Sequence, residues 1–249
     1  TLSKSDDQLT ARGNISRPGS VADFADLHLV PGGSVVAKAY IGASGGDKLN
    51  LATGEIAAFN ALRNPGDSVN AVEQQLRMML LSRYQAYRSA GLAGIQPYDR
   101  GGKSSDPAAD LRKASEAPVL KRFFPAVQKV LAGYPQVTVP GLKENFFWVN
   151  NRIDDLPTCA LTHLLIAPEG SARIVIQRQF YVGRSYNAEQ AIAGFFPVQQ
   201  GTLVAYVNHT FTDQVSGFGS STKQSIGRRV MGNTLKELFK KARGAAAQP

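Results

Sequence analysis

Three polar side chains interrupt apolar faces of strand-like segments, and their types could do acid–base or anion-binding chemistry. The segments have alternating patterns typical of half-buried strands and cover residues 158–168, 172–184 and 202–211. In each segment one phase is apolar except for a single residue, namely His163, Arg178 and His209. If the three strands are neighbours, these side chains lie on the same side of one sheet.

Arg178 is the most demanding of the three, because a buried guanidinium without a partner is costly. We expect it to meet a carboxylate, a carbonyl or the anionic group of a ligand. Asp213, just beyond the last strand, is the candidate carboxylate in the sequence. The alternative is that all three residues are satisfied core or sheet-margin residues.

Aromatic residues gather in the same half of the chain and favour a mainly apolar pocket with a few polar anchors. Phe195 and Phe196 fall in residues 185–201, which we interpret as a helical turn or an irregular flap that could close over an apolar ligand. The predicted ligand-binding residues are Trp148, His163, Arg178, Phe180, Phe195, Phe196, His209, Phe211 and Asp213.

Other motifs favour turns rather than catalysis. Residues 42–46, Gly-Ala-Ser-Gly-Gly, match the letters of a nucleophile elbow, but no apolar helix follows directly. Residues 102–104, Gly-Lys-Ser, lack the glycine five positions earlier that a phosphate-binding loop needs. Asp154 and Asp155 are adjacent and read as turn residues. With one cysteine, Cys159, and no zinc-ligand spacing, we predict no catalytic residue, no metal site and no cofactor.

The expected helices and strands that position these residues indicate an α+β fold, with a helical N-terminal half and an antiparallel sheet in the second half. Residues 1–30 are expected to be a flexible arm, and residues 31–243 one domain. Its mainly helical part, 31–140, holds one strand at 34–41 and helices at 54–64, 69–90 and 107–132, the last divided by Pro118 and Pro125. The part 141–243 contains the four strands 144–152, 158–168, 172–184 and 202–211, a hairpin turn at 169–170, and a long amphipathic helix that ends near Arg243. Residues 244–249 are expected to be a disordered tail.

The charge balance permits contact with anionic partners. The 249 residues carry 28 Lys plus Arg against 19 Asp plus Glu, which gives a net charge of +9. Much of the excess falls in residues 83–122 and 223–243, both interpreted as largely helical. A cationic helix face suits nucleic acid or anionic head groups, or is a solvated surface.

The order of antiparallel strands, an interruption and a closing helix over residues 145–243 resembles the helix-grip fold of START-type lipid-binding domains. The resemblance implies a lipid or sterol in a cavity between a curved sheet and the closing helix. It departs from the family in the first half, where additional strands are expected. The same C-terminal pattern is also similar to uncharacterised proteobacterial envelope proteins.

Three hypotheses follow. The leading one is a non-enzymatic binding or transfer protein for an apolar or amphipathic ligand such as a lipid, held between sheet and C-terminal helix, with peripheral contact to an anionic membrane. The second is an enzyme that acts on a small acidic substrate through His163, Arg178 and His209. The third is nucleic-acid binding through the basic helices, for which no module is recognisable. The expected compartment is the bacterial envelope or periplasm, with the cytoplasm as the alternative.

Overall fold

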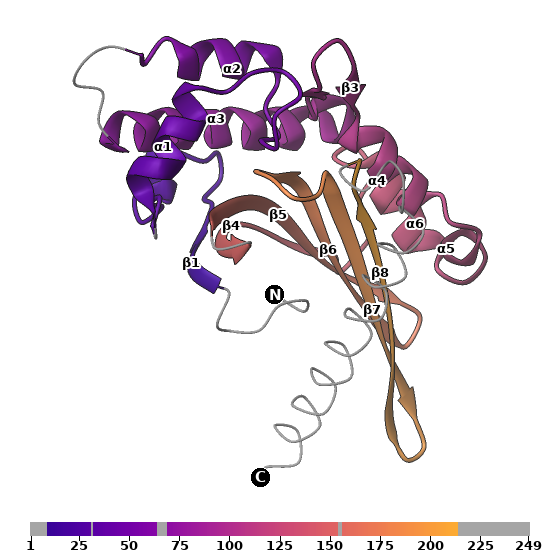
Figure 1. The fold of residues 1–249 in the computed structure, drawn as a ribbon. Helices are drawn as coiled ribbons and strands as arrows, with labels where there is room; N and C mark the ends of the chain where they lie inside the picture. The colour runs from indigo at the N-terminus through magenta and orange to yellow at the C-terminus, as the bar shows by residue number, and fades with distance from the viewer. Residues whose placement is uncertain (1–8, 31, 64–68, 154–155, 214–249) are drawn as a thin grey trace.

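A six-stranded antiparallel sheet with a layer of helices on one of its faces makes up most of the described residues (Figure 1). The computed structural model describes residues 9–30, 32–63, 69–153 and 156–213. The α+β class and the antiparallel sheet predicted from the sequence are confirmed. The expected helix of residues 220–243 and the expected tail of 244–249 lie outside the described residues.

Six strands build the sheet in the order β1-β4-β5-β6-β7-β8, with every neighbouring pair antiparallel. All but β1 follow one another along the chain, so short hairpins join them. Gly170, with φ of +60°, makes the predicted turn between β5 and β6. The strands are β1 Leu9–Asn14, β4 Lys143–Ile153, β5 Leu156–Glu169, β6 Ala172–Val182, β7 Ala188–Val198 and β8 Gly201–Phe211.

The helices lie between β1 and β4 in the chain, and the longest agrees with its apolar periodicity. The buried positions Val72, Leu76, Met79 and Leu80 of α3 recur at helical spacing. Prolines divide the last helical region as predicted, each at a position where its missing N–H costs nothing. The helices are α1 Gly33–Ile41, α2 Thr53–Asn60, α3 Val69–Ala90, α4 Pro107–Ser115, α5 Pro118–Phe123 and α6 Pro125–Gly133, with the 3₁₀ turns η2 Val21–Phe24 and η3 Gly91–Gly94.

Three expectations about local structure are corrected. Residues 34–41 form helix α1 rather than a strand, because Val36, Ala37 and Tyr40 share one buried helical face. Residues 185–201 were expected to hold a helical turn or an irregular flap, but residues 188–198 of this segment are the regular strand β7, which lies between β6 and β8 in the sheet. Residues 9–14 of the expected arm form β1, which pairs with β4.

Two apolar clusters hold the helices to the sheet. The larger one joins α1, α2 and α3 to the strands around Phe146, Trp148 and Phe180. The smaller one places Leu120 of α5 and three residues of α6 against Leu165, Ile174 and Ile192 and their neighbours. Within the described residues, no helix is long and apolar enough to cross a membrane.

Candidate functional site

The register of the sheet places His163, Arg178 and His209 in one row. His163 on β5 pairs directly with Arg178 on β6. Gln190 on β7 pairs with Arg178 on one side and with His209 on β8 on the other. The prediction that the three residues share one side of a sheet is therefore confirmed, and that side faces the helices.

Arg178 is fully buried, and groups from the helices and the sheet surround its guanidinium. Its Nε donates to Gln190 Oε1 at 3.0 Å, and its Nη2 donates to Ser115 Oγ on α4 at 2.8 Å and to the Leu131 carbonyl on α6 at 3.0 Å. Nη1 donates to the Tyr87 hydroxyl on α3 at 3.3 Å. The carboxylate expected from Asp213 is not among these partners, because Asp213 pairs with Arg100 at 2.7 Å. Arg178 therefore ties three helices to the centre of the sheet.

His163 continues this network toward the surface. Its Nε2 lies 3.0 Å from Glu144 on β4, and its Nδ1 lies 3.1 Å from the Tyr87 hydroxyl. An ε-protonated neutral ring fits both contacts: Nε2–H donates to the carboxylate and Nδ1 accepts from Tyr87. Glu144 also pairs with Arg17 at 2.6 Å.

Burial and the positive charge of Arg178 lower the pKa of His163 to about 4, against the opposing effect of its hydrogen bond to Glu144. The same hydrogen bond lowers the pKa of Glu144, and the positive charge of Arg17 lowers it further. At neutral pH the row therefore holds a neutral imidazole beside a carboxylate. His163 and Arg178 face each other inside the packed core, where protein groups occupy their hydrogen-bonding positions.

The remaining predicted residues divide between core and surface. Trp148 and Phe180 are buried, with the Trp148 indole donating to the Asp23 carbonyl at 2.7 Å and Phe180 stacked on Tyr87 at 4.1 Å. His209 and Phe211 lie on the outer strand β8 and are half-buried, with ring centroids 6.4 Å apart. The structure does not bring His209 to His163.

Phe195 and Phe196 point to opposite faces of β7. Phe196 packs on Phe124 beside the helices, with ring centroids 5.9 Å apart. Phe195 lies on the other face of the sheet, where it lines a hollow of about 380 Å³. The hollow crosses five strands, and its lining is Arg12, Gly13, Asn14, Asn145, Phe147, Leu164, Val175, Gln177 and Phe195.

Apolar and polar groups divide the hollow. Phe147, Leu164, Val175 and Phe195 give it an apolar wall on β4 to β7. Gln177 is only 3 % exposed, and its amide Nε2 has no hydrogen-bond partner among the described residues. A buried donor without a partner carries a desolvation cost, which a hydrogen-bond acceptor would relieve.

Cation and amide groups lie at the β1 side of the same hollow. Arg12 is exposed on β1 and lines the hollow beside Asn14, which accepts a hydrogen bond from Asn145 at 3.3 Å. Only Phe195 of the predicted ligand residues belongs to this hollow. In the sequence, Gln177 lies in the second phase of strand 172–184 together with Gln179, but nothing in the sequence marks it as buried.

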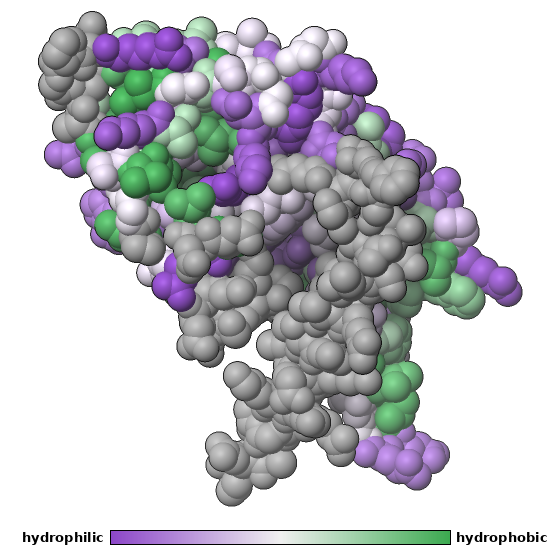
Figure 2. All heavy atoms as spheres, in the orientation of Figure 1, coloured by the Kyte–Doolittle hydropathy of each residue, from purple (hydrophilic) through white to green (hydrophobic). Residues whose placement is uncertain are grey.

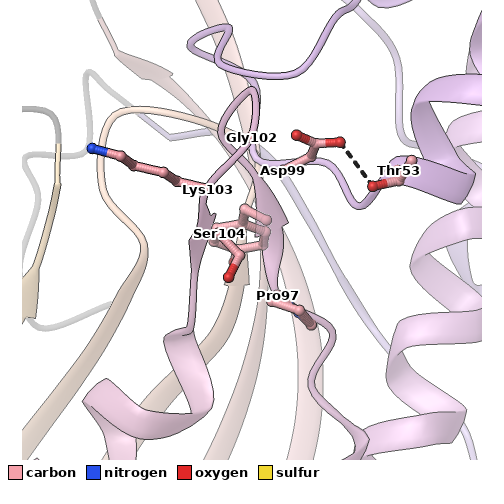
Figure 3. A pocket seen from close by; sticks show the side chains of 7 residues that line it. Thr53, Pro97, Asp99, Gly102, Lys103 and Ser104 are labelled. Atoms are coloured by element: carbon pink, nitrogen blue, oxygen red, sulfur yellow. Dashed lines mark hydrogen bonds between the residues drawn. The ribbon is translucent and has the colours of Figure 1, made fainter.

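The glycine-rich motifs form turns, as interpreted from the sequence. Residues 102–104 belong to the hairpin of β2 Tyr98–Asp99 and β3 Ser104–Ser105, where Gly101 and Gly102 have positive φ. A hollow of about 380 Å³ lies beside this hairpin. Figure 3 shows Asp99 from its lining hydrogen-bonded to Thr53, with the Lys103 side chain extended away from both. Ser44 follows helix α1 rather than a strand, so it does not occupy a nucleophile elbow. Residues 154 and 155 lie outside the described residues.

The basic stretch 83–122 is not one cationic helix face. It runs from the end of α3 through the β2–β3 hairpin into α4 and α5. Two of its arginines form ion pairs within the protein: Arg83 is buried against Glu55 at 2.6 Å, and the half-buried Arg100 pairs with Asp213. The second basic stretch, 223–243, lies outside the described residues.

The part of the chain that the structure describes contains no group of three or more His, Cys, Asp or Glu side chains that could hold a metal ion. Comparison with family models, with curated proteins and with solved structures gave no match to this chain.

Proposed function

We propose that the protein is a non-enzymatic binding or transfer protein for an amphipathic ligand, such as a lipid, and that the ligand occupies the hollow on the sheet face away from the helices. The observation that carries the proposal is the buried amide Nε2 of Gln177, which has no hydrogen-bond partner among the described residues, in an otherwise apolar wall. A ligand acceptor there would satisfy the donor, and the aliphatic part of the ligand would cover Phe147, Leu164 and Phe195.

The polar end of the hollow supports a ligand with an anionic head. Arg12 and the side-chain amides of Asn14 and Asn145 lie at the β1 side, whereas Phe195 lies at the β7 side. A carboxylate or phosphate near Arg12 would gain charge-assisted hydrogen bonds. A fatty acid or an anionic phospholipid therefore has the right distribution of charge and hydrocarbon.

The direct test is native mass spectrometry of the purified chain, followed by calorimetric titration of the lipid-free protein with oleate. We expect a co-purified lipid and saturable oleate binding. Arg12→Ala should weaken oleate binding about tenfold, since a charge-assisted hydrogen bond is lost. The matched control is Arg112→Ala on the exposed face of α4, which should bind oleate as the parent does. A parent protein that neither carries lipid nor binds oleate or a phospholipid contradicts the proposal.

Replacing Gln177 with leucine gives a prediction in which stability and affinity separate. Leucine removes the unpaired buried N–H₂, so the free energy of unfolding should stay the same or rise. Oleate affinity should fall about threefold to tenfold, because the ligand loses its hydrogen bond. Chemical denaturation and calorimetry on the same preparation measure the two effects. Unchanged affinity together with unchanged stability would show that no ligand acceptor meets this amide.

The proposal includes peripheral contact with an anionic membrane, supported by α5. This helix exposes Val119 by 52 % and Phe123 by 57 %, with the exposed cations Lys121 and Arg122 between them. Exposed apolar groups beside cations suit the surface of an anionic bilayer, where each basic residue contributes about 1 kcal/mol.

Sedimentation with lipid vesicles tests this contact. The parent should co-sediment with phosphatidylglycerol vesicles and not with phosphatidylcholine vesicles. The double variant Lys121→Glu/Arg122→Glu should bind the anionic vesicles at least tenfold more weakly, given about 1 kcal/mol for each cation. Lys38→Glu, an exposed change on α1, is the control and should leave vesicle binding as it is. Equal binding of both vesicle types would contradict an electrostatic contact.

The enzyme and nucleic-acid hypotheses stay predictions.

A further inference from the structure

The two edges of the six-stranded sheet are built differently. The β1 edge is six residues long, its register with β4 shifts between Leu9 and Ala11, and it exposes the cation Arg12. Short length, a bulge and an exposed charge are the features by which edge strands resist pairing with other chains. The β1 edge is therefore protected.

The β8 edge has none of these features. Gly201–Phe211 is eleven residues long, contains no proline and no Asp, Glu, Lys or Arg, and keeps an unbroken register with β7 along its whole length. Among the described residues, no strand pairs with its outer side. An edge of this length and composition is a template for another β-strand.

Exposed apolar side chains accompany this free edge. Leu203 is 59 % exposed and Val207 is 40 % exposed, on the same face of β8, and Val198 at the hairpin is 51 % exposed. The β7–β8 hairpin projects beyond the helical layer in Figure 1, and Figure 2 shows apolar (green) side chains along it above a hydrophilic tip. Six of the ten large apolar residues exposed in the described chain lie on α5 or this hairpin, so the exposure is concentrated: Val119, Phe123, Phe195, Val198, Leu203 and Val207.

We propose that two copies of this chain associate through antiparallel pairing of their β8 strands, which joins the two sheets into one. An antiparallel pair of identical strands is two-fold symmetric. The same surface of each copy therefore forms the contact, and the assembly closes as a dimer. The absence of charged residues in β8 means that no like charges meet across the axis. Leu203 and Val207 of each copy would cover one another on one face of the joined sheet.

The alternative head-to-tail pairing of β8 with β1 fits less well. It would set an eleven-residue strand against a six-residue strand with a bulge and an exposed Arg12. It would also leave one free edge at each end of the assembly and propagate into filaments. The contrast between the two edges therefore favours a closed pair of β8 strands.

Sedimentation equilibrium of the full chain at micromolar concentration tests the proposal. We expect a mass twice the chain mass of 26.7 kDa. The double variant Leu203→Lys/Val207→Lys should sediment at the single-chain mass, because four cations meet across the axis. Both sites are exposed, so the fold is retained, which circular dichroism checks. Val35→Lys, at a helical position with 63 % exposure, is the matched control and should sediment as a dimer.

Charge exchange makes the test specific for β8 pairing. Leu203→Glu/Val207→Glu should also be monomeric alone, and an equimolar mixture with the lysine variant should regain the doubled mass, because opposite charges now face each other. A parent that sediments as a monomer overturns the proposal. So does a lysine variant that stays dimeric, or a mixture of the two variants that stays monomeric.

Discussion

Arg178→Ala is expected to lower the free energy of unfolding by about 3–5 kcal/mol, the range seen when a buried charged network loses a central member. The guanidinium is fully buried and its hydrogen bonds reach α3, α4, α6 and β7. Alanine leaves Gln190 Oε1, the Ser115 hydroxyl and the Leu131 carbonyl without this donor, each in an interior where an unpaired polar group costs about 1–3 kcal/mol. The truncation also leaves a cavity.

Denaturant titration at neutral pH measures this effect. Arg178→Lys should recover only part of the loss, because one ammonium cannot reproduce the planar fork that reaches Gln190, Ser115 and Leu131 together. Arg112→Ala, on the exposed side of α4, should shift stability by no more than about 0.5 kcal/mol. A loss of less than about 1 kcal/mol in Arg178→Ala would show that the helices are held to the sheet without this residue.

The position of Arg178 could be predicted in part because strand alternation has a period of two. Alternation in β5 and β6 placed His163 and Arg178 on one face, and the register then made them direct neighbours. Their partners could not be predicted, since Tyr87 and Ser115 come from helices whose packing on the sheet is set by tertiary contacts. Gln190 was missed with its strand: β7 is rich in alanine and contains Gly194 and Pro197, residues that disfavour strands in isolation.

The same limits explain the errors in the first half. Residues 34–41 contain valine and isoleucine, which favour strands locally, but Val36, Ala37 and Tyr40 bury one helical face while Val35 stays exposed. Packing of that face in the larger apolar cluster outweighs the local preference. β1 has alternating half-buried and exposed residues and gains its ladder from β4, more than 120 positions later in the chain, a partner that local pattern does not reveal.

From the sequence, the ligand-binding residues are expected on the phase of the strands that carries His163 and Arg178. His163, Arg178 and Phe180 belong to the face that the helices cover, so their burial reflects core packing. The other phase carries Gln177, whose polarity reads from sequence alone as a solvent-facing position. Only the fold shows that Gln177 is buried and that its amide Nε2 has no hydrogen-bond partner in the part of the chain that the structure describes.

Acid is expected to destabilise the protein in a window that His163 sets. The pKa of His163 is about 4 in the folded chain against 6.5 as its ordinary value, because burial and the charge of Arg178 disfavour the imidazolium. Between these values the unfolded chain binds one more proton than the folded chain. The resulting stability is therefore fully present above about pH 6.5 and is lost as the pH falls toward 4. At about 1.4 kcal/mol for each pH unit, the loss reaches about 3 kcal/mol.

Glu144 adds a second loss at lower pH. Its folded pKa lies below the ordinary 4.5, so its contribution is present above that pH and is lost as the carboxylate protonates in the folded chain. Denaturant titrations at pH 7, 6 and 5 separate the two groups, because the pKa of Glu144 lies below this range. His163→Gln should be less stable at pH 7 and should lose little more on going to pH 5. If the parent and His163→Gln lose stability in parallel between pH 6.5 and 5, the core does not hold the imidazole neutral. The protons in the row of hydrogen bonds from Glu144 through Tyr87 to Arg178 would then be arranged differently.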